Sequence, residues 1–457
     1  MMKLRHWPAH QIVWRWHFYA GLFCIPFILL LSVTGGVYLF KPQVEAVLDT
    51  PYERLVLTGP AAPAHHQVQA ALQAVPGAIL HAYELPVHPQ SAVRVLVKQG
   101  QVISRVYVHP QTLQVLNIAR EDAKVMRIMH ELHGNLLLGA RGSYLVELAA
   151  SWAIVMVITG LYLWWPKAGQ GLAGVVFPRL GRSSRLFWRD LHAVTGFWVA
   201  IFTLFLLISG LPWTKSWGGM LKEIRQTQIT GAKMVKAQPQ DWTIGGLAAE
   251  EHAAHTGHMP AWHSPGPAQD YRLLDQLVAT VAPLQLAPPV LIAPPSEKST
   301  DWTARSDAQN RPLRVNIRFD AAGHIASRKN FADRPWLDRV IGVGVAIHEG
   351  QLFGWLNQAL GALTALGLVL LSVSSVVLWW QRLKNTSLLH TLGAPPRRQP
   401  APYAWAMIGM VLVLGLLLPF FGLSLLLVLG IERGLMLYFP RLAGYLGLDR
   451  TYRKVES

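Results

Sequence analysis

Charged residues are scarce in this chain of 457 residues, of which only 14% are Asp, Glu, Lys or Arg. Ordinary soluble domains carry about 25% charged residues. Apolar residues make up 52% of the chain, tryptophan occurs 18 times, and the mean hydropathy is positive. This composition excludes an ordinary soluble protein and predicts an integral membrane protein in contact with lipid.

Cysteine is almost absent, since Cys24 is the only one. An intrachain disulfide is therefore excluded, and so is covalent c-type haem, which needs a Cys-x-x-Cys-His motif. Iron–sulfur ligation by cysteines is excluded as well. A dinucleotide-binding fold finds no support either, because the glycines of GVGVAIHEG (342–350) lack the required spacing and precede an apolar segment.

Long charge-free runs are abundant, and about 18 apolar residues suffice to cross a bilayer as a helix. The second run extends further if Glu147 is tolerated. The first is too long for the apolar part of a cleaved signal peptide, so we expect an uncleaved anchor. The fifth contains Pro419 and is either one kinked helix or two short ones. The five runs are 16–40, 148–165, 191–214, 350–381 and 399–431.

The formal net charge of +16 would suggest nucleic acid for a soluble protein. Here the basic residues gather in short segments beside the apolar runs, and short basic loops stay cytoplasmic. We therefore predict no nucleic-acid partner, a multi-pass topology with a cytoplasmic N-terminus, and two outer segments, about 41–124 and 215–346. The two basic groups are Lys167, Arg179, Arg182, Arg185 and Arg189, and Arg382, Lys384, Arg397 and Arg398.

An internal repeat runs through the chain. RWHFYAGLF (15–23) matches DLHAVTGFW (190–198), and HGNLLLGARGSYL (133–145) matches HEGQLFGWLNQAL (348–360). The runs that follow the second pair end alike, in GLYLWWPK and SVVLWWQR, and Trp-Trp before a cation suits the cytoplasmic interface. A unit of span, outer segment and span is thus used twice.

Each outer segment predicts a helix followed by a β-hairpin. The helices are 65–75 and 271–282, and the hairpins turn near Gly100 and at Gly323. Between the segments lies a linker rich in Pro and His, roughly 238–269. Its histidines, beside a methionine, have a spacing that suits an accessory metal site, although a solvated loop is the simpler interpretation. These histidines are His252, His255 and His258.

Four histidines lie at two depths of the predicted bundle. His17 and His192 open outward-running spans near the cytoplasmic face, and His133 and His348 open inward-running spans near the outer face. Ionisable residues at membrane depth are rare and usually functional, and neutral imidazole is a good ligand for haem iron. The repeat predicts two pairs that hold two b-type haems; the alternative is that these histidines cap or anchor helices. Neighbouring glycines would leave room for the macrocycle: Gly21, Gly196, Gly134 and Gly350.

Three further residues are candidates for this site. His130 lies one helical turn before His133. It could replace His133 as a ligand, bind a haem propionate, or be an exposed polar residue. Arg189 and Arg141 could pair with propionates or with lipid phosphates.

Together these motifs resemble the PepSY-associated transmembrane proteins, a family that includes inner-membrane ferrisiderophore reductases. The carriers are RWHFYAG, HGNLLLGARGSYL, RDLHAVTGFW and IHEGQLFGWLNQALG, and VYVHPQTLQVL resembles the PepSY hairpin. The resemblance covers about residues 10–430. It implies two haems b held by His17, His133, His192 and His348, and reduction of ferric siderophores at the bacterial inner membrane. One departure is SVSS (372–375), where the family usually has Thr-Gly.

The expected fold is a mainly α-helical integral membrane protein with four core transmembrane helices in two repeats, a C-terminal hydrophobic segment and two small α+β PepSY-like periplasmic domains. The expected function is haem-dependent ferric reduction, with a quinol or a cytoplasmic reductase as electron donor. The alternative is a non-enzymatic siderophore or metal transporter or assembly factor. The expected boundaries are 1–40 (tail and first span), 41–128 (first domain), 129–166 (second span), 167–187 (loop), 188–214 (third span), 215–346 (second domain), 347–381 (fourth span), 382–402 (loop), 403–438 (C-terminal segment) and 439–457 (tail).

Overall fold

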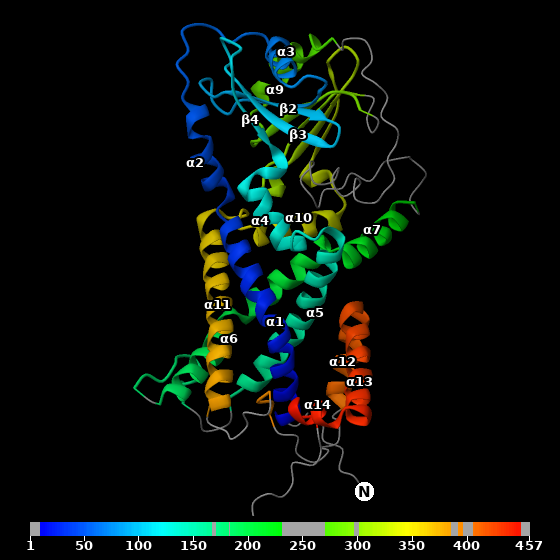
Figure 1. Cartoon of the computed structure of the whole chain (residues 1–457). Coiled ribbons are helices and arrows are strands. Elements are labelled where there is room, and N and C mark those ends of the chain that lie inside the picture. Colours follow the sequence, from blue (N-terminus) through cyan, green and yellow to red (C-terminus); the bar gives the residue numbers. More distant parts are fainter. Residues whose placement is uncertain are drawn as a thin grey trace, which may run out of the picture. The chain divides into compact units, whose positions relative to one another are not determined.

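Two units make up the chain in the computed structural model. The helical unit comprises Met1–Gly36, His133–Gly231 and Ala362–Ser457, and the sheet-bearing unit comprises Val37–Leu132 and Ala232–Gly361. The structure describes residues 10–166, 171–181, 183–230, 270–296, 301–384, 392–395 and 405–448 (Figure 1).

Among the described residues, five helices are long and apolar enough to cross a membrane, which confirms the prediction of a multi-pass membrane protein. In such an environment the backbone polar groups must be satisfied within each segment, so a continuous helix is the stable form. The third span continues from α6 through the 3₁₀ turn η2, Leu211–Trp213. The five helices are α1 (His10–Tyr38), α5 (Gly139–Trp164), α6 (Ser184–Gly210), α11 (Trp355–Lys384) and α13 (Pro419–Tyr438).

Four of these helices contact one another in a closed order, α1 to α5, α5 to α6, α6 to α11 and α11 to α1. Small residues allow the close approaches, as at Gly367, where a Cβ would come within 2.6 Å of Val199 Cγ1. In this order α1 and α6 are diagonal, so their facing side chains meet between the other two helices. The contacts are Cys24 with the Ala149 carbonyl, Trp164 stacked on Phe197, Gly367 with Val199, and Gly36 with Ala365.

The C-terminal apolar segment consists of two helices, which answers the question that the sequence left open. Helix α12 (Trp405–Leu417) and helix α13 are separated at Leu418, whose backbone is not helical. They lie side by side (Figure 1), and a Cβ at Gly422 would come within 2.9 Å of the Gly415 carbonyl oxygen. A short helix, α14 (Pro440–Tyr445), follows.

Glu147 is a buried carboxylate inside α5, and hydrogen bonds to nearby backbone amides make its burial tolerable. Its Oε2 accepts the backbone N–H of Ser216 at 3.0 Å and of Trp217 at 3.4 Å. These amides belong to the first turn of α7 (Lys215–Thr230). A carboxylate at a helix N-terminus satisfies amides that have no partner within the helix. Glu147 therefore caps α7.

Within the described residues, the sheet-bearing unit contains one eight-stranded antiparallel sheet, to which each of the two predicted outer segments contributes four strands. The strand order is β4-β3-β2-β1-β5-β6-β7-β8. The two halves join where Tyr83 of β1 pairs with Ile292 of β5. The strands are β1 (Ile79–Glu84), β2 (Val93–Gln99), β3 (Val102–Val108), β4 (Val115–Arg120), β5 (Val290–Ala293), β6 (Thr303–Ser306), β7 (Val315–Phe319) and β8 (Ile325–Asn330).

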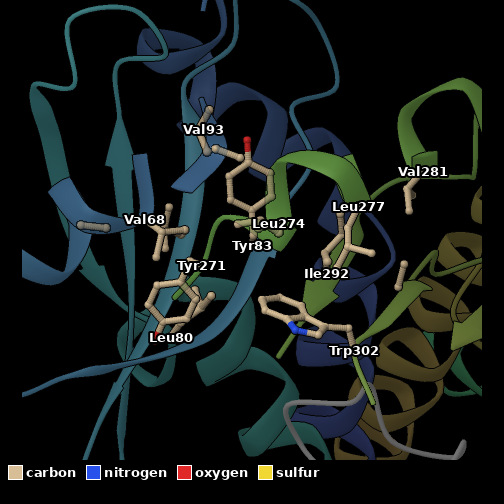
Figure 2. Packing of buried hydrophobic residues seen from close by; sticks show 14 of the residues in the cluster. Val68, Leu80, Tyr83, Val93, Tyr271, Leu274, Leu277, Val281, Ile292 and Trp302 are labelled. Carbon is tan, nitrogen blue, oxygen red and sulfur yellow. The ribbon is translucent and has the colours of Figure 1, made fainter. Parts of the chain in front are cut away.

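One hydrophobic core spans both halves of this sheet. Helices α3 (Ala64–Ala74) and α9 (Leu273–Val281) confirm the two predicted outer helices. Val68 of α3 and Leu274 of α9 are fully buried against Tyr83 and Ile292 (Figure 2). The predicted turns at Gly100 and Gly323 are also confirmed, since both glycines have positive φ between paired strands.

An ionic network lies on the opposite face of strands β1 to β3, because Glu84, Arg94 and Arg105 alternate with the core residues. It fastens helix α2 (Lys41–Glu53) and the 3₁₀ turn η1 (Glu121–Ala123) to the sheet. Each arginine contacts more than one carboxylate, as buried charges require. Arg94 contacts Asp49, Glu53 and Glu84, and Arg105 contacts Glu84 and Glu121.

Candidate functional site

The four predicted histidines fall on four different helices. His17 lies on α1 and His192 on α6, both within the helical unit. His133 lies on the short helix α4 (Val125–Asn135), and His348 is the last residue of α10 (Trp336–His348). His133 belongs to the helical unit and His348 to the sheet-bearing unit. The pairing of His133 with His348 stays a prediction.

His133 and His348 do not open membrane spans, which differs from the sequence prediction. Each lies in the last turn of a short helix, and the span begins several residues later, at Gly139 in α5 and at Trp355 in α11. Residues with positive φ separate the helices in both repeats: Leu136, Leu137 and Gly139 in the first, and Gly350 and Gly354 in the second. A left-handed backbone ends a right-handed helix. Both histidines therefore stand just outside a span.

His17 and His192 form a close pair in the helical unit. Their ring centroids are 6.3 Å apart and their planes are inclined by 80°. The two rings come from α1 and α6, the diagonal helices, and both are partly buried. The sequence prediction that the symmetry of the repeat brings these two residues together agrees with this geometry.

The side chain of His17 is held by helix α5. Its Nδ1 lies 3.1 Å from the Met156 carbonyl oxygen and 3.1 Å from Thr159 Oγ1. Thr159 donates its own hydroxyl hydrogen to the Val155 carbonyl at 2.8 Å. Both neighbours of Nδ1 are therefore acceptors, and Nδ1 must carry the proton. The lone pair of the neutral ring is then on Nε2.

His192 is held in the same way by helix α11. Its Nδ1 lies 3.3 Å from the Leu371 carbonyl oxygen and 3.1 Å from Ser374 Oγ. Ser375 Oγ is a third neighbour at 3.2 Å. Both serine hydroxyls donate to the Leu371 carbonyl, so here too the histidine donates from Nδ1 and keeps its lone pair on Nε2.

His133 has an equivalent holder on helix α1. Its Nδ1 lies 3.0 Å from the Leu31 carbonyl oxygen and 3.2 Å from Thr34 Oγ1, and Thr34 donates to the Leu30 carbonyl. In all three cases a carbonyl at one position and a hydroxyl three residues later bind Nδ1. We call these five-residue stretches hydroxyl boxes: LSVTG (31–35), MVITG (156–160) and LSVSS (371–375), with a fourth of the same pattern, LLISG (206–210), on α6.

The sequence prediction missed the role of the hydroxyl boxes. The small pairs Thr34-Gly35 and Ser209-Gly210 are visible in the repeat, but no hydroxyl was matched to a histidine. The available signal was that every one of the four core spans carries Ser or Thr followed by Gly or Ser at the same offset. A hydroxyl in an apolar helix usually bonds its own backbone. Its second bond, to an incoming imidazole, needs the tertiary structure.

Two glycines other than those predicted to leave room for the macrocycle lie against the histidine rings. A Cβ at Gly160 would lie 3.1 Å from His17 Cε1, and one at Gly35 would lie 2.8 Å from His133 Cε1. By contrast, a Cβ at Gly196 would make an ordinary contact of 3.6 Å, and one at Gly134 would meet no atom within 4 Å in the described part of the chain. The tight glycines thus accommodate the imidazole rings themselves.

The remaining candidates have defined surroundings. His130 lies on α4 with its ring centroid 5.5 Å from that of Tyr38 and its Nδ1 3.8 Å from Glu131. Arg141 is exposed at the start of α5. His252, His255 and His258 lie outside the residues that the structure describes.

Arg189 is engaged by a carboxylate of its own helix. Its Nη2 lies 2.7 Å from Asp190 Oδ1. Asp190 is fully buried and is also bound by Arg179, through Nε at 2.6 Å and Nη2 at 2.9 Å. Such a two-point contact holds the 171–181 loop at the first turns of α6, two residues before His192. Asp190 therefore fixes the loop that precedes the His192 helix, a role that the sequence prediction did not assign.

The His17–His192 pair fits a metal-centred group. Imidazole nitrogens bind metals at about 2 Å and lie about 1 Å from the ring centre, so two rings on opposite sides of one metal have centres roughly 6 Å apart. The observed separation is 6.3 Å. Metal-binding histidines almost always donate their other N–H to a carbonyl or similar acceptor, and both rings do so. The pair therefore has the spacing and protonation that two neutral imidazole ligands would need.

These features define a multi-pass membrane protein with a partly buried histidine pair among its long helices and a sheet-bearing unit. The family model described as PepSY-associated TM region matches residues 14–382. The chain therefore belongs to this family, as the sequence motifs indicated. Among curated proteins, no match was found.

Proposed function

We propose that this protein is a b-type haem electron-transfer protein of the bacterial inner membrane that reduces ferric siderophores on the periplasmic side. The observation that carries the proposal is the His17–His192 pair, with ring centroids 6.3 Å apart and both Nδ1 atoms bound by acceptors. Two neutral imidazoles with Nε2 lone pairs could hold the iron of a haem b between them.

The chain's own side chains set the orientation and the protonated nitrogen of each histidine ring. Thr159 and Ser374 accept hydrogen bonds from the Nδ1–H groups and so fix the tautomer of each ring, which leaves the lone pair on Nε2. The apolar faces of the spans keep water from the pair. A haem held there by His17 and His192 would supply one-electron redox chemistry.

Reduction of the ferric substrate needs one electron and forms no new covalent bond. Ferric iron is a hard ion held by siderophore oxygens, and ferrous iron is held by them far less tightly. One electron from a membrane quinol or a cytoplasmic reductase converts ferric to ferrous iron, and the siderophore then releases it. The basic loops beside the spans favour a cytoplasmic N-terminus, which puts the sheet-bearing unit on the periplasmic side, where a ferric siderophore arrives.

The test starts with the absorption spectrum of purified protein from haem-replete cells. We expect a Soret band and, after reduction by dithionite, the sharp α-band of six-coordinate haem b. His17→Ala and His192→Ala should each lose the same haem. His324→Ala is the control, because His324 is three-quarters exposed in the sheet-bearing unit.

Reductase activity is tested separately from haem binding. Protein reduced by dithionite and freed of excess reductant should be reoxidised by ferric siderophore under anaerobic conditions. Red protein that is not reoxidised would retain the haem assignment and remove the substrate class. A colourless preparation, or full haem content in both histidine variants, would overturn the proposal and favour the transporter or assembly factor.

A further inference from the structure

The two hydroxyl boxes that hold the central histidine pair differ at one position. Alignment on the shared Leu-Trp-Trp ends places Thr159 opposite Ser374 and Gly160 opposite Ser375. Three of the four hydroxyl boxes end in glycine, at positions 35, 160 and 210, and only the box on α11 ends in a residue with a hydroxyl. The second repeat therefore carries a polar group that the first repeat lacks.

That extra hydroxyl is directed at a ligand candidate. Ser375 Oγ lies 3.2 Å from His192 Nδ1 and donates its hydrogen to the Leu371 carbonyl at 2.7 Å. Since its hydrogen is committed there, the oxygen can only accept from the histidine. The Nδ1–H of His192 thus faces three acceptors, whereas that of His17 faces two, the Met156 carbonyl and Thr159.

We propose that Ser375 is a positioning residue that makes His192 the more strongly electron-donating imidazole of the pair and thereby lowers the reduction potential of the haem between His17 and His192. The inference rests on the proposed function, since it requires that haem. Acceptors at Nδ1–H raise the basicity of a ligating imidazole, and a more basic ligand stabilises ferric over ferrous iron. Hydrogen bonding around the ligands is one of the ways a protein sets a haem potential.

A potential lowered in this way suits the reaction. A more reducing haem near the cytoplasmic face passes its electron more readily to the predicted outer haem and from there to a tightly held ferric ion. The same haem is harder to reduce, so the hydroxyl also restricts which donors can supply the electron. Ser375 would thus tune the site to a strong reductant and a stable ferric substrate.

The experiment is a redox titration of purified protein, followed through the reduced α-band. Ser375→Gly recreates the first-repeat box and should raise the midpoint potential of the component that disappears in His17→Ala. Ser375→Ala keeps the Cβ but removes the acceptor and should raise it similarly. Ser375→Thr keeps the hydroxyl and should stay near wild type. The low-spin ferric EPR signal should shift in the glycine and alanine variants for the same reason.

The outcomes separate the inference from the proposed function. Absence of haem from wild-type protein overturns the proposed function itself. Haem bound by His17 and His192 with the same midpoint potential and EPR signal in wild type, Ser375→Gly and Ser375→Ala overturns only the inference. Loss of haem from all three Ser375 variants also overturns it, because Ser375 would then secure the ligand instead of tuning it.

Discussion

Thr159 on α5 and Ser374 on α11 are equivalent residues: each hydroxyl lies 3.1 Å from the Nδ1 of a histidine on the helix beside it. The equivalence extends to the carbonyls of Met156 and Leu371, three residues earlier. The two repeats share little sequence, yet they hold their histidines with the same pattern of hydrogen bonds.

Removing either hydroxyl should weaken haem binding. In Thr159→Val and Ser374→Ala the imidazole keeps one acceptor fewer, and loss of a partner behind a metal ligand costs roughly 10–100-fold in affinity. Titration of haem-depleted protein with haemin measures this. Thr203→Val is a matched control, because Thr203 is buried in α6 and its Oγ1 has no hydrogen-bond partner among the described residues. Equal affinity in Thr159→Val and Thr203→Val would show that the hydroxyl is unimportant.

A methyl group at Gly160 should disturb His17. The added Cβ would lie 3.1 Å from His17 Cε1, closer than most packed carbons, so the ring must move. Gly160→Ala should lower the haem content of purified protein. Gly196→Ala on α6 is the control, since its Cβ would lie 3.6 Å from Leu371 Cδ2. If both variants hold as much haem as the wild type, the close approach at Gly160 does not define the ligand position.

Glu147 should contribute to stability and not to electron transfer. Glu147→Ala leaves the amides of Ser216 and Trp217 without their acceptor and should cost about 2 kcal/mol. Glu147→Gln keeps an oxygen acceptor and should lose less. Thermal unfolding in detergent, followed by circular dichroism, orders the three proteins. A change in haem potential with unchanged stability would instead place Glu147 in the redox site.

The ionic network should make stability fall in acid. Burial alone would raise the pKa of Glu121, but Arg105 and Lys124 outweigh this and lower it to about 2. The carboxylate therefore stabilises the fold above its ordinary pKa of 4.5, and this stability is lost as the pH falls from there towards 2. Glu121→Gln should be less stable than wild type at neutral pH.

The two proteins should converge in acid, which thermal unfolding at about pH 7, 4 and 2.5 can measure. Asp122→Asn is the control, because Asp122 is nearly half exposed in its pair with Arg120 and exposed pairs contribute little. A difference in unfolding temperature between wild type and Glu121→Gln that stays constant down to the lowest pH would contradict the assigned role of Glu121.

Much of the helical unit was predictable because its signals are local. Apolar length alone located the four core spans and the C-terminal apolar segment, and the repeat nominated His17 and His192 as partners. The break at Leu418 was only half visible, since Pro419 is compatible with a kink or with a new helix. The short helices before Gly139 and Trp355 were missed because the left-handed residues Leu136 and Leu137 carry no sequence signature of a turn.

The sheet was harder to predict because its defining contact is not local. The strands β1 and β5 are short, and the pairing of Tyr83 with Ile292 joins residues more than 200 positions apart. The role of the hydroxyl boxes was not predicted from the sequence for a related reason. Thr159 and Ser375 look like ordinary small residues in apolar helices until another helix brings a histidine to them.

The β1–β5 pairing also bears on how such a chain could arise. A half-length ancestor with one span, outer segment and span would leave the β1 edge unpaired, and a bare edge strand invites association with another chain. Two copies could have satisfied each other as a symmetric dimer joined at that edge. Fusion of two such copies would leave each free to diverge, and positions 160 and 375, glycine in one copy and serine in the other, differ in this way.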